Sequence, residues 1–258
     1  MFKILGKRSQ VKFIVFGLPR SGTTTLTRIF NAHDNLRCLH EPFSGNLNYL
    51  MYFQGRQFKQ KEIVDELKLK SILGKIFSRF NGIKHLSYQL PPELNRVLLT
   101  YPDCKVILMR RKNILQRIIS NCISNQAKYW KSNKKKIINT EFKRVGIKWI
   151  EGRIAEDMLT TENYRAILKD SGKEYYELNY EDLLGAKLTV DEKLNKLKEI
   201  FHYLGVRSVL TPSERRKVEK FLDPAKSKLN SEYTYLKIPN IKEVENAVGS
   251  KETGFIFK

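Results

Sequence analysis

The residues of this chain best suited to bind an oxyanion form the segment GLPRSGTTT at positions 17–25. A short apolar run ends at Gly17, and from Thr23 onward apolar residues recur with the spacing of a helix. A glycine-bounded loop between a strand and a helix exposes backbone N–H groups at the positive end of the helix, where phosphate or sulfate binds. The spacing Gly17-x4-Gly22 therefore predicts an anion-binding loop.

The residue types in this loop differ from those of nucleoside triphosphatases. An ATP- or GTP-binding loop places a lysine after its second glycine, whereas Thr23 stands there in this chain and the cation is Arg20, inside the loop. An internal arginine with three hydroxyls is suited to hold a phosphosulfate group without a metal, and we expect no metal site. A nucleotide-dependent kinase is the alternative.

A second basic group follows an apolar run at positions 104–109, which is typical of a strand buried on both faces. Arg110 and Arg111 end this run, and Ser120 lies two turns into the predicted helix that follows. Ligands of open α/β sheets bind beyond the carboxyl ends of the strands, so both basic groups belong to one edge. Two anion sites on one edge suit a nucleotide with phosphates at both ends. Either arginine is a candidate, and we favour Arg111.

Three segments in this order resemble sulfotransferases that use 3′-phosphoadenosine 5′-phosphosulfate (PAPS). The sequence PRSGTT at 19–24 resembles their 5′-phosphosulfate loop, and Arg111 with Ser120 resembles their 3′-phosphate site with one residue inserted. YEDLL at 180–184 and FHYLG at 201–205 resemble a third common segment. The resemblance implies a P-loop NTPase-like sulfotransferase fold, with PAPS as co-substrate. The residues that it implies for nucleotide binding are Pro19, Arg20, Ser21, Gly22, Thr23, Thr24, Thr25, Arg110 or Arg111, Ser120, Tyr180 and Ser231.

Positions 16–41 are most similar to the tyrosylprotein sulfotransferases, whose pattern here is G-x-P-R-S-G-T-T-L-x-R-x-x-L-x-A-H-P-x-x-R-C-x-E-E. Their catalytic base, the second glutamate, falls on Glu41, and His40 replaces the first glutamate. The stretch at 231–240 resembles a segment that closes over the nucleotide, which implies that Ser231 lies near the reacting sulfate. Their catalytic lysine corresponds to Lys84, although the spacing differs by two residues.

The resemblance thus implies transfer of a sulfuryl group from PAPS to an acceptor hydroxyl, with release of 3′-phosphoadenosine 5′-phosphate (PAP). Glu41 is expected to take the acceptor's proton, while Arg20, Lys84 and Ser231 complete the catalytic set. His40 is the alternative base, and the alternative role of Glu41 is to be a structural partner for Arg20 or Arg37. The acceptor stays open among carbohydrates, lipids, small molecules and tyrosine, and we expect loops at 42–60 and 125–140 to bind it.

Alternating strand and helix signals predict an α/β fold with a central parallel sheet flanked by helices. We expect one domain, 1–258, whose tail at 225–258 closes over the nucleotide and contains turns and a short apolar segment. The expected strands are 11–16, 83–85, 104–109 and 174–178. Three of the expected helices begin at 23, 91 and 113. Four more are expected over 60–80, 140–170, 190–204 and 213–222.

The charge of the chain favours anionic partners. The formal net charge is +21, which attracts anions such as PAPS, an acidic substrate, a membrane surface or nucleic acid. The alternative is a lysine-rich composition that only keeps the helices solvated. The lysine-rich run at 131–136 has no interleaved aromatic residues, so we expect no nucleic-acid partner, while peripheral membrane contact stays open. A basic module without catalytic activity is a further alternative, and the oligomeric state is open.

The cellular location is predicted from what the chain carries. No apolar run reaches 18 residues, so no transmembrane helix is expected, and the apolar patch at the N-terminus is too short for a secretory signal. The three cysteines (Cys38, Cys104 and Cys122) are an odd number without metal-ligand spacing. We therefore expect free thiols and a cytoplasmic protein.

Overall fold

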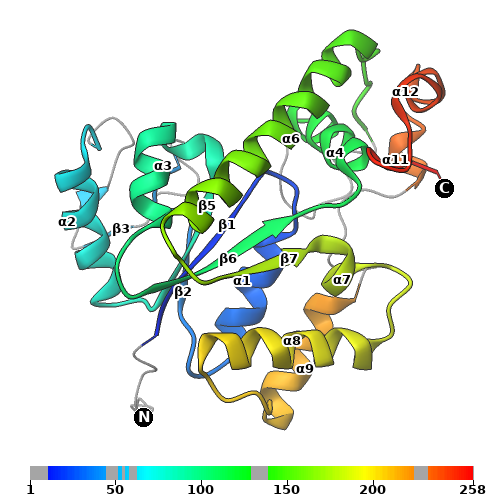
Figure 1. Cartoon of the computed structure of the whole chain (residues 1–258). Coiled ribbons are helices and arrows are strands. Elements are labelled where there is room, and N and C mark those ends of the chain that lie inside the picture. The colour runs from blue at the N-terminus through cyan, green and yellow to red at the C-terminus, as the bar shows by residue number, and fades with distance from the viewer. Residues whose placement is uncertain are drawn as a thin grey trace.

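A parallel sheet of five strands forms the centre of the molecule, in the order β2-β5-β1-β6-β7 (Figure 1). The computed structural model describes residues 11–44, 52–53, 56–57, 63–128, 139–223 and 232–257. The strands are β1 (Lys12–Gly17), β2 (Cys38–His40), β5 (Gly82–Leu86), β6 (Cys104–Arg110) and β7 (Tyr175–Asn179). A separate short pair consists of β3 (Tyr52–Phe53) and β4 (Arg56–Gln57). The predicted fold class is confirmed.

The middle strands end level with one another at the edge that holds the site. Gly17 at the end of β1 pairs in register with Leu86 of β5 and with Met109 of β6. Because all three strands run in the same direction, the segments that follow them emerge side by side. The loop after β1 therefore lies between the segments that follow β5 and β6.

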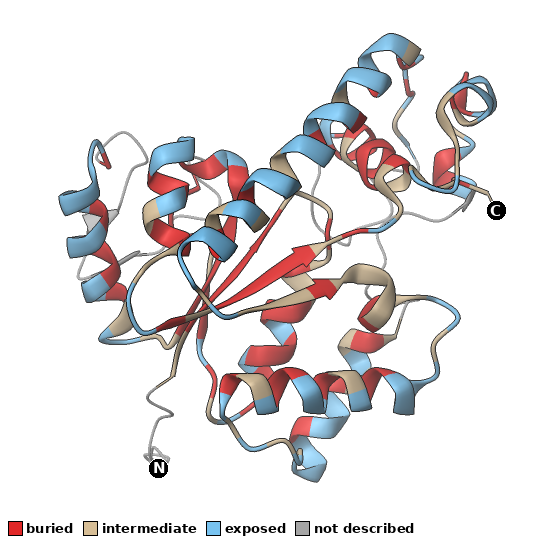
Figure 2. Ribbon diagram, viewed as in Figure 1, coloured by how far each residue is buried: buried red, intermediate tan, exposed pale blue. Residues whose placement is uncertain are grey.

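Helices cover both faces of the sheet (Figure 1). One face carries α1 (Thr23–Ala32), α7 (Tyr180–Leu184), α8 (Val190–Leu204) and α9 (Pro212–Leu222). The other face carries α2 (Glu66–Phe77), α3 (Pro92–Leu99) and part of α6 (Ile147–Asp170). A third apolar cluster joins the N-terminal part of α6 to α4 (Ile114–Gln126), α11 (Glu232–Tyr235) and α12 (Ile241–Val248). Within the sheet, β1, β5 and β6 are almost continuously buried, whereas β7 is largely half-buried (Figure 2).

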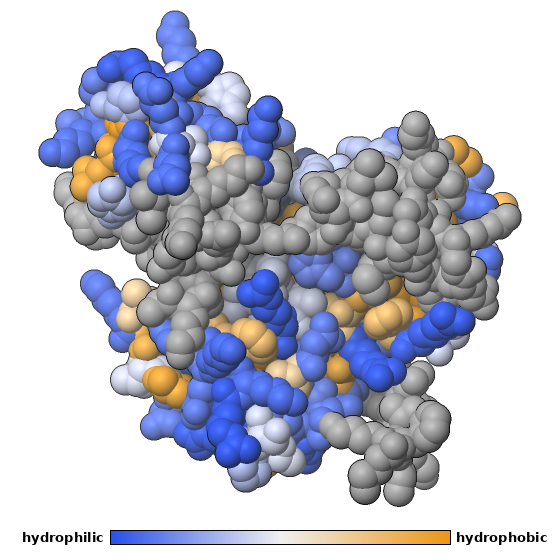
Figure 3. All heavy atoms as spheres, turned by 180° about the vertical axis from the view of Figure 1, so that it is seen from behind, coloured by the Kyte–Doolittle hydropathy of each residue, from blue (hydrophilic) through white to orange (hydrophobic). Residues whose placement is uncertain are grey.

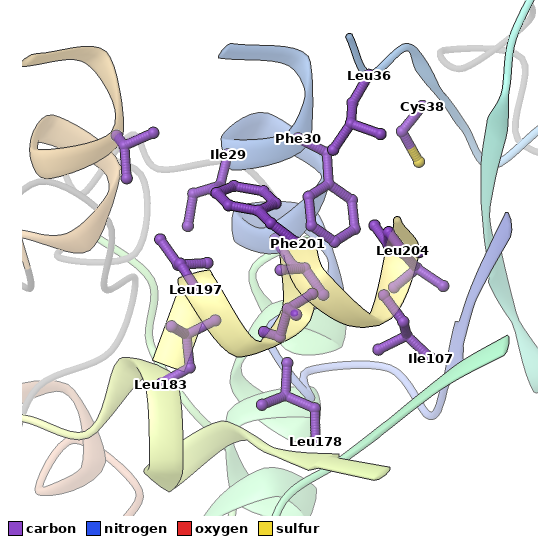
Figure 4. Close-up of a cluster of buried hydrophobic side chains, with 14 of the residues drawn as sticks. Ile29, Phe30, Leu36, Cys38, Ile107, Leu178, Leu183, Leu197, Phe201 and Leu204 are labelled. Carbon is purple, nitrogen blue, oxygen red and sulfur yellow. The ribbon is translucent and has the colours of Figure 1, made fainter. Parts of the chain in front are cut away.

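The core on the α1 side shows how the first helix is fixed against the sheet (Figure 4). Phe30 of α1 packs edge-on against Phe13 of β1, with ring centroids 5.2 Å apart, and lies 6.3 Å from Phe201 of α8. All three rings are fully buried. Burying such rings contributes about 1.5–3 kcal/mol each, so α1 and the loop before it are held firmly.

Three elements differ from the sequence-based expectations. β2 has only three residues and was not predicted. The helix expected over 140–170 begins at Ile147, because Gly146 is extended and Phe142 and Val145 of the preceding segment are buried in the third cluster. The tail contains α11 and α12 rather than turns alone. Ser231 and the run at 131–136 lie outside the described residues.

Candidate active site

The loop at 17–22 leads into α1 with a geometry that leaves the helix N-terminus open to an anion. Gly22 caps α1 with φ 89°, and a Cβ there would lie 2.7 Å from Cδ2 of Tyr180, so only glycine fits. The cap makes no side-chain hydrogen bond, and the first turn, Thr23 to Thr25, has no acidic residue. The first N–H groups of α1 are therefore suited to an external anion.

Ser21 supplies a buried hydroxyl in this loop. The side chain is fully buried, and its Oγ has no hydrogen-bond partner in the described part of the chain. Unsatisfied buried polar atoms are rare in folded proteins. An anionic ligand of the loop is the kind of group that would satisfy it, so Ser21 fits a phosphosulfate group.

A buried ion pair holds the loop in place. Arg117 of α4 donates from Nη1 to the carbonyl oxygen of Pro19 at 2.9 Å, and its Nη2 pairs with Asp157 of α6. Both charged side chains are almost fully buried. Arg117 thus connects the loop to two helices of the third cluster.

Arg20 links the loop to the segment that follows β6. Its backbone is in the left-handed region, with φ 69°, and its Nε lies 3.1 Å from Oγ of Ser120 on α4. The two residues are 100 positions apart in sequence. The structure therefore brings together the predicted loop cation and the predicted 3′-phosphate serine.

Arg111, rather than Arg110, faces this region. The guanidinium of Arg111 lies 4.5 Å from the ring centroid of Tyr180, and its side chain is only 6% exposed. It donates to Gln116, while its Nε has no hydrogen-bond partner among the described residues. Arg110 instead binds Glu177 of β7 at 2.9 Å. Of the two candidates, Arg111 is the one positioned beside the loop.

Tyr180 and a tail residue, Tyr235, show that the two predicted anion sites adjoin. Burial raises the pKa of each phenol, and the positive charges of both Arg111 and Arg20 oppose that rise. Tyr235 lies on α11 and is 2% exposed. The charges of Arg111 and Arg20 thus act on the same two phenols, so the two arginines lie close to one another.

Glu41 and Lys84 form the second part of the site. Glu41 follows β2 with φ 49°, and its N–H donates to the carbonyl oxygen of Lys84 on β5 at 3.0 Å. The Glu41 carboxylate also pairs with the Lys84 ammonium, which is 2% exposed. Lys84 Nζ donates to Oγ1 of Thr24 at 2.9 Å, at the N-terminus of α1. The pairing of β2 with β5 therefore places a carboxylate and an ammonium next to the loop.

His40 is the neighbour of this pair. Its Nε2 lies 3.4 Å from Nζ of Lys84 and 3.5 Å from Oγ1 of Thr24. Burial, reinforced by the charge of Lys84, lowers the pKa of His40 to about 4. The pKa of Lys84 is also lowered, because the effect of burial exceeds the opposing effect of the Glu41 carboxylate. At neutral pH His40 is uncharged, and its Nε2 lies within reach of two donors.

A cleft of about 150 Å³ lies behind the loop, between the ends of β1 and β6 and helix α6. Its lining includes Leu18, Ser21, Arg111 and Arg117. Glu41 and Lys84 are not among the lining residues, so this cleft adjoins the arginine side of the site rather than the carboxylate side.

The structure thus groups the predicted site residues that it describes, and Arg110, although bound to Glu177, lines the same cleft as Arg111. Ser231 and most of the two expected acceptor loops lie outside the described residues. The sequence interpretation missed three residues, which are Arg117, Tyr235 and Gln89, whose amide donates a hydrogen bond to Glu41. Arg117 could have been found from its spacing, because it lies one turn before Ser120 on the same helix. Gln89 and Tyr235 carry no such signal.

The family model of the sulfotransferase domain matches residues 10–247, so the chain belongs to the sulfotransferase domain family. This membership confirms the predicted class, a sulfotransferase, and lends no support to the kinase alternative.

Among solved structures, the chain is similar to a crystal structure of mouse sulfotransferase SULT7A1 complexed with PAP. The TM-score is 0.46 at 15% sequence identity, and the match covers 88% of this chain and 70% of the mouse chain. No curated protein sequence matches. Within the described residues, no helix is both long and apolar enough to span a bilayer, and no cluster of three metal-ligating side chains occurs.

Proposed function

We propose that this sulfotransferase transfers the sulfuryl group of PAPS to an acceptor hydroxyl, with Glu41 as the base that removes the proton. The observation that carries the proposal is the contact chain from Glu41 through Lys84 to Thr24. It joins a buried carboxylate to the open N-terminus of α1. A base, a cation and an anion-binding helix end thus lie within one hydrogen-bonded group.

The donor end of the site consists of two groups of residues. The backbone N–H groups of the loop, together with Arg20 and the hydroxyls of Ser21, Thr23, Thr24 and Thr25, are proposed to hold the phosphosulfate. Arg111, Ser120 and Tyr180 are proposed to hold the 3′-phosphate. The Arg20–Ser120 contact and the stacking of Arg111 on Tyr180 support this assignment. PAPS supplies the sulfuryl group and a leaving phosphate.

The chemistry needs negative charge to be stabilised as the sulfuryl group leaves. Each preorganised donor of this kind contributes about 3–4 kcal/mol in comparable sites. Arg20 and Lys84 are proposed as the cations that do this, and Ser231 stays a prediction. His40 is the alternative base, but its Nε2 lies near two hydrogen-bond donors, whereas a carboxylate has more acceptor capacity.

Finer aspects of the function are also proposals. We propose a single domain whose tail at 225–258 closes over the nucleotide, which the burial of Tyr235 beside Arg111 supports. We propose a cytoplasmic location, supported by three buried free thiols whose pKa burial raises. The acceptor class is a carbohydrate, lipid, small molecule or tyrosine.

The proposal is tested by sulfate transfer from radiolabelled PAPS to panels of sugars, lipids, phenols and tyrosine peptides. With the acceptor found, Glu41→Gln should bind PAP normally but turn over on the order of 10²–10⁴-fold more slowly, because a positioned base contributes that much. Glu93→Gln, an exposed glutamate on α3, is the matched control and should keep full activity. Normal turnover of Glu41→Gln would remove Glu41 from the base role.

A further inference from the structure

Gln89 is a buried side chain that contacts the proposed base. It ends the short 3₁₀ turn η3 (Ser87–Gln89), which directly follows β5, and it is 1% exposed. Its Nε2 donates to Oε2 of Glu41 at 2.8 Å, and its Oε1 accepts from the N–H of Leu86 at 3.0 Å. Both ends of the amide are therefore hydrogen-bonded.

The orientation of this amide does not depend on Glu41. A backbone N–H can only donate, so the N–H of Leu86 requires the oxygen of the Gln89 amide on its side. The nitrogen of the amide must then face Glu41. Gln89 thus presents a fixed donor to one oxygen of the carboxylate.

The turn that carries Gln89 is itself anchored. Asn95 of α3 is fully buried, and its Nδ2 donates to the carbonyl oxygens of Ser87 at 2.6 Å and Leu90 at 2.9 Å. These two carbonyls bracket Gln89 in sequence. The backbone on either side of Gln89 is therefore fixed to a helix.

The other oxygen of Glu41 has a different kind of partner. Oε1 pairs with the ammonium of Lys84, which is carried on a flexible chain and also bonds to Thr24. A lysine ammonium is a point charge that can rotate toward a bound anion. The Gln89 amide lacks this freedom because a hydrogen bond holds it at each end. The two oxygens of the carboxylate are therefore not equivalent.

We propose that Gln89 is a positioning residue that fixes the Glu41 carboxylate and leaves Oε1 as the oxygen that takes the acceptor's proton. This inference rests on the proposed function, in which Glu41 is the base. The proton of the acceptor hydroxyl goes to Oε1 while the acceptor oxygen bonds to sulfur. The bond from sulfur to the bridging oxygen breaks, and PAP leaves with that electron pair.

Two substitutions at Gln89 separate positioning from simple packing. Gln89→Met keeps the size of the side chain but removes the donor, so kcat should fall about 10- to 100-fold, as expected for a hydrogen bond to a charged group. PAP affinity and the KM for the acceptor should change less than about twofold, because in this proposal neither ligand contacts Gln89.

Gln89→Glu gives a signature that a structural role would not produce. At low pH the introduced carboxyl keeps its proton and donates to Glu41 as the amide does. At higher pH that proton leaves, two carboxylates face each other, and kcat should fall. The pH profile of Gln89→Glu therefore gains a fall in kcat that the wild type does not show at the same pH. Asn195→Asp, which adds the same charge on the exposed side of α8, is the matched control and should follow the wild-type profile.

A readout that needs neither nucleotide nor acceptor is the carboxyl ¹³C signal of Glu41, assigned by its loss in Glu41→Gln. Its chemical shift should move in Gln89→Glu, where a second carboxylate replaces the amide donor, and stay unchanged in Asn195→Asp. A Gln89→Glu protein whose pH profile and Glu41 signal match the wild type would overturn the role of Gln89 alone. Full activity in Glu41→Gln would instead overturn the proposed base, and the role of Gln89 with it.

Discussion

Two residues of the candidate site adopt a backbone conformation that residues other than glycine rarely take. Arg20 and Glu41 have φ 69° and 49°, in the left-handed region. Such a conformation costs on the order of 1–3 kcal/mol per residue and persists where the surroundings fix it. Around Glu41 those surroundings are the hydrogen bonds to Lys84 and Gln89. At both positions the strain accompanies a side chain directed at the proposed reaction.

His85 of β5 follows Lys84 in the chain, and we expect its protonation to affect the stability of the fold. It is fully buried, its Nε2 bonds to Oδ1 of Asn95 at 2.7 Å, and its Nδ1 has no partner among the described residues. Burial lowers the pKa of His85 from 6.5 to about 4. The unfolded chain therefore takes up this proton at a higher pH than the folded protein does.

We predict that the free energy of unfolding falls as the pH drops from about 6.5 to about 4, with a contribution from His85 on the order of 3 kcal/mol. His85→Gln should flatten this dependence, because the amide bonds to Asn95 without titrating; His40 contributes a remaining slope in the same direction. The measurement is urea unfolding at several pH values. His202→Gln, at an exposed position on α8, serves as the control, and equal slopes for His85→Gln and the wild type would contradict the prediction.

At the scale of elements, the loop depends on helices that are distant in sequence. The ion pair between Arg117 of α4 and Asp157 of α6 also fixes the carbonyl of Pro19. Removing one member of a buried pair leaves the other charge unpaired, which costs much more than removing an exposed pair. The loop geometry and the stability of the fold are thus coupled through one side chain.

We predict that Asp157→Ala lowers the free energy of unfolding by about 3–5 kcal/mol and weakens PAP binding. Glu156→Ala removes the neighbouring, exposed partner of Arg153 and should change stability by less than about 0.5 kcal/mol. Urea unfolding and calorimetric titration with PAP measure the two effects. Equal stability losses in the two variants would show that the buried pair does not anchor the loop.

The sequence predicted the elements whose signal is local. β1 and β6 are runs of apolar residues, and the glycines at 17 and 22 mark the loop between β1 and α1. β2 has three residues, too few for a periodic pattern, and forms because it pairs with β5. The predicted start of α6 was wrong because Phe142 and Val145 pack in the third cluster, which is a tertiary effect that the local sequence does not show.

The same limit applies to the site. The loop, Arg111 and Glu41 could be identified from residue types and order. Lys84 was only the nearest lysine at an imperfect spacing, and the register that pairs it with His40 is what places it beside Glu41. Gln89 could not be found, because its role depends on a turn and on a contact across 48 positions.

At the scale of the whole molecule, charge and topology act together. The described surface seen from behind is mostly hydrophilic (Figure 3), and the chain carries a formal net charge of +21. A positive field attracts a nucleotide that carries phosphates at both ends. The parallel sheet brings the loop after β1 and the arginine after β6 to one edge, where we propose that they bind the two ends of a single nucleotide.

The affinity for PAP compared with adenosine 5′-monophosphate, measured by calorimetric titration in the wild type and in Arg111→Ala, tests this two-point grip directly. Arg110→Ala, whose side chain binds Glu177, is the neighbouring comparison. We predict that Arg111→Ala weakens PAP about 10- to 100-fold but leaves the monophosphate almost unaffected, because only PAP carries the 3′-phosphate. Equal losses for the two nucleotides in Arg111→Ala would contradict the account.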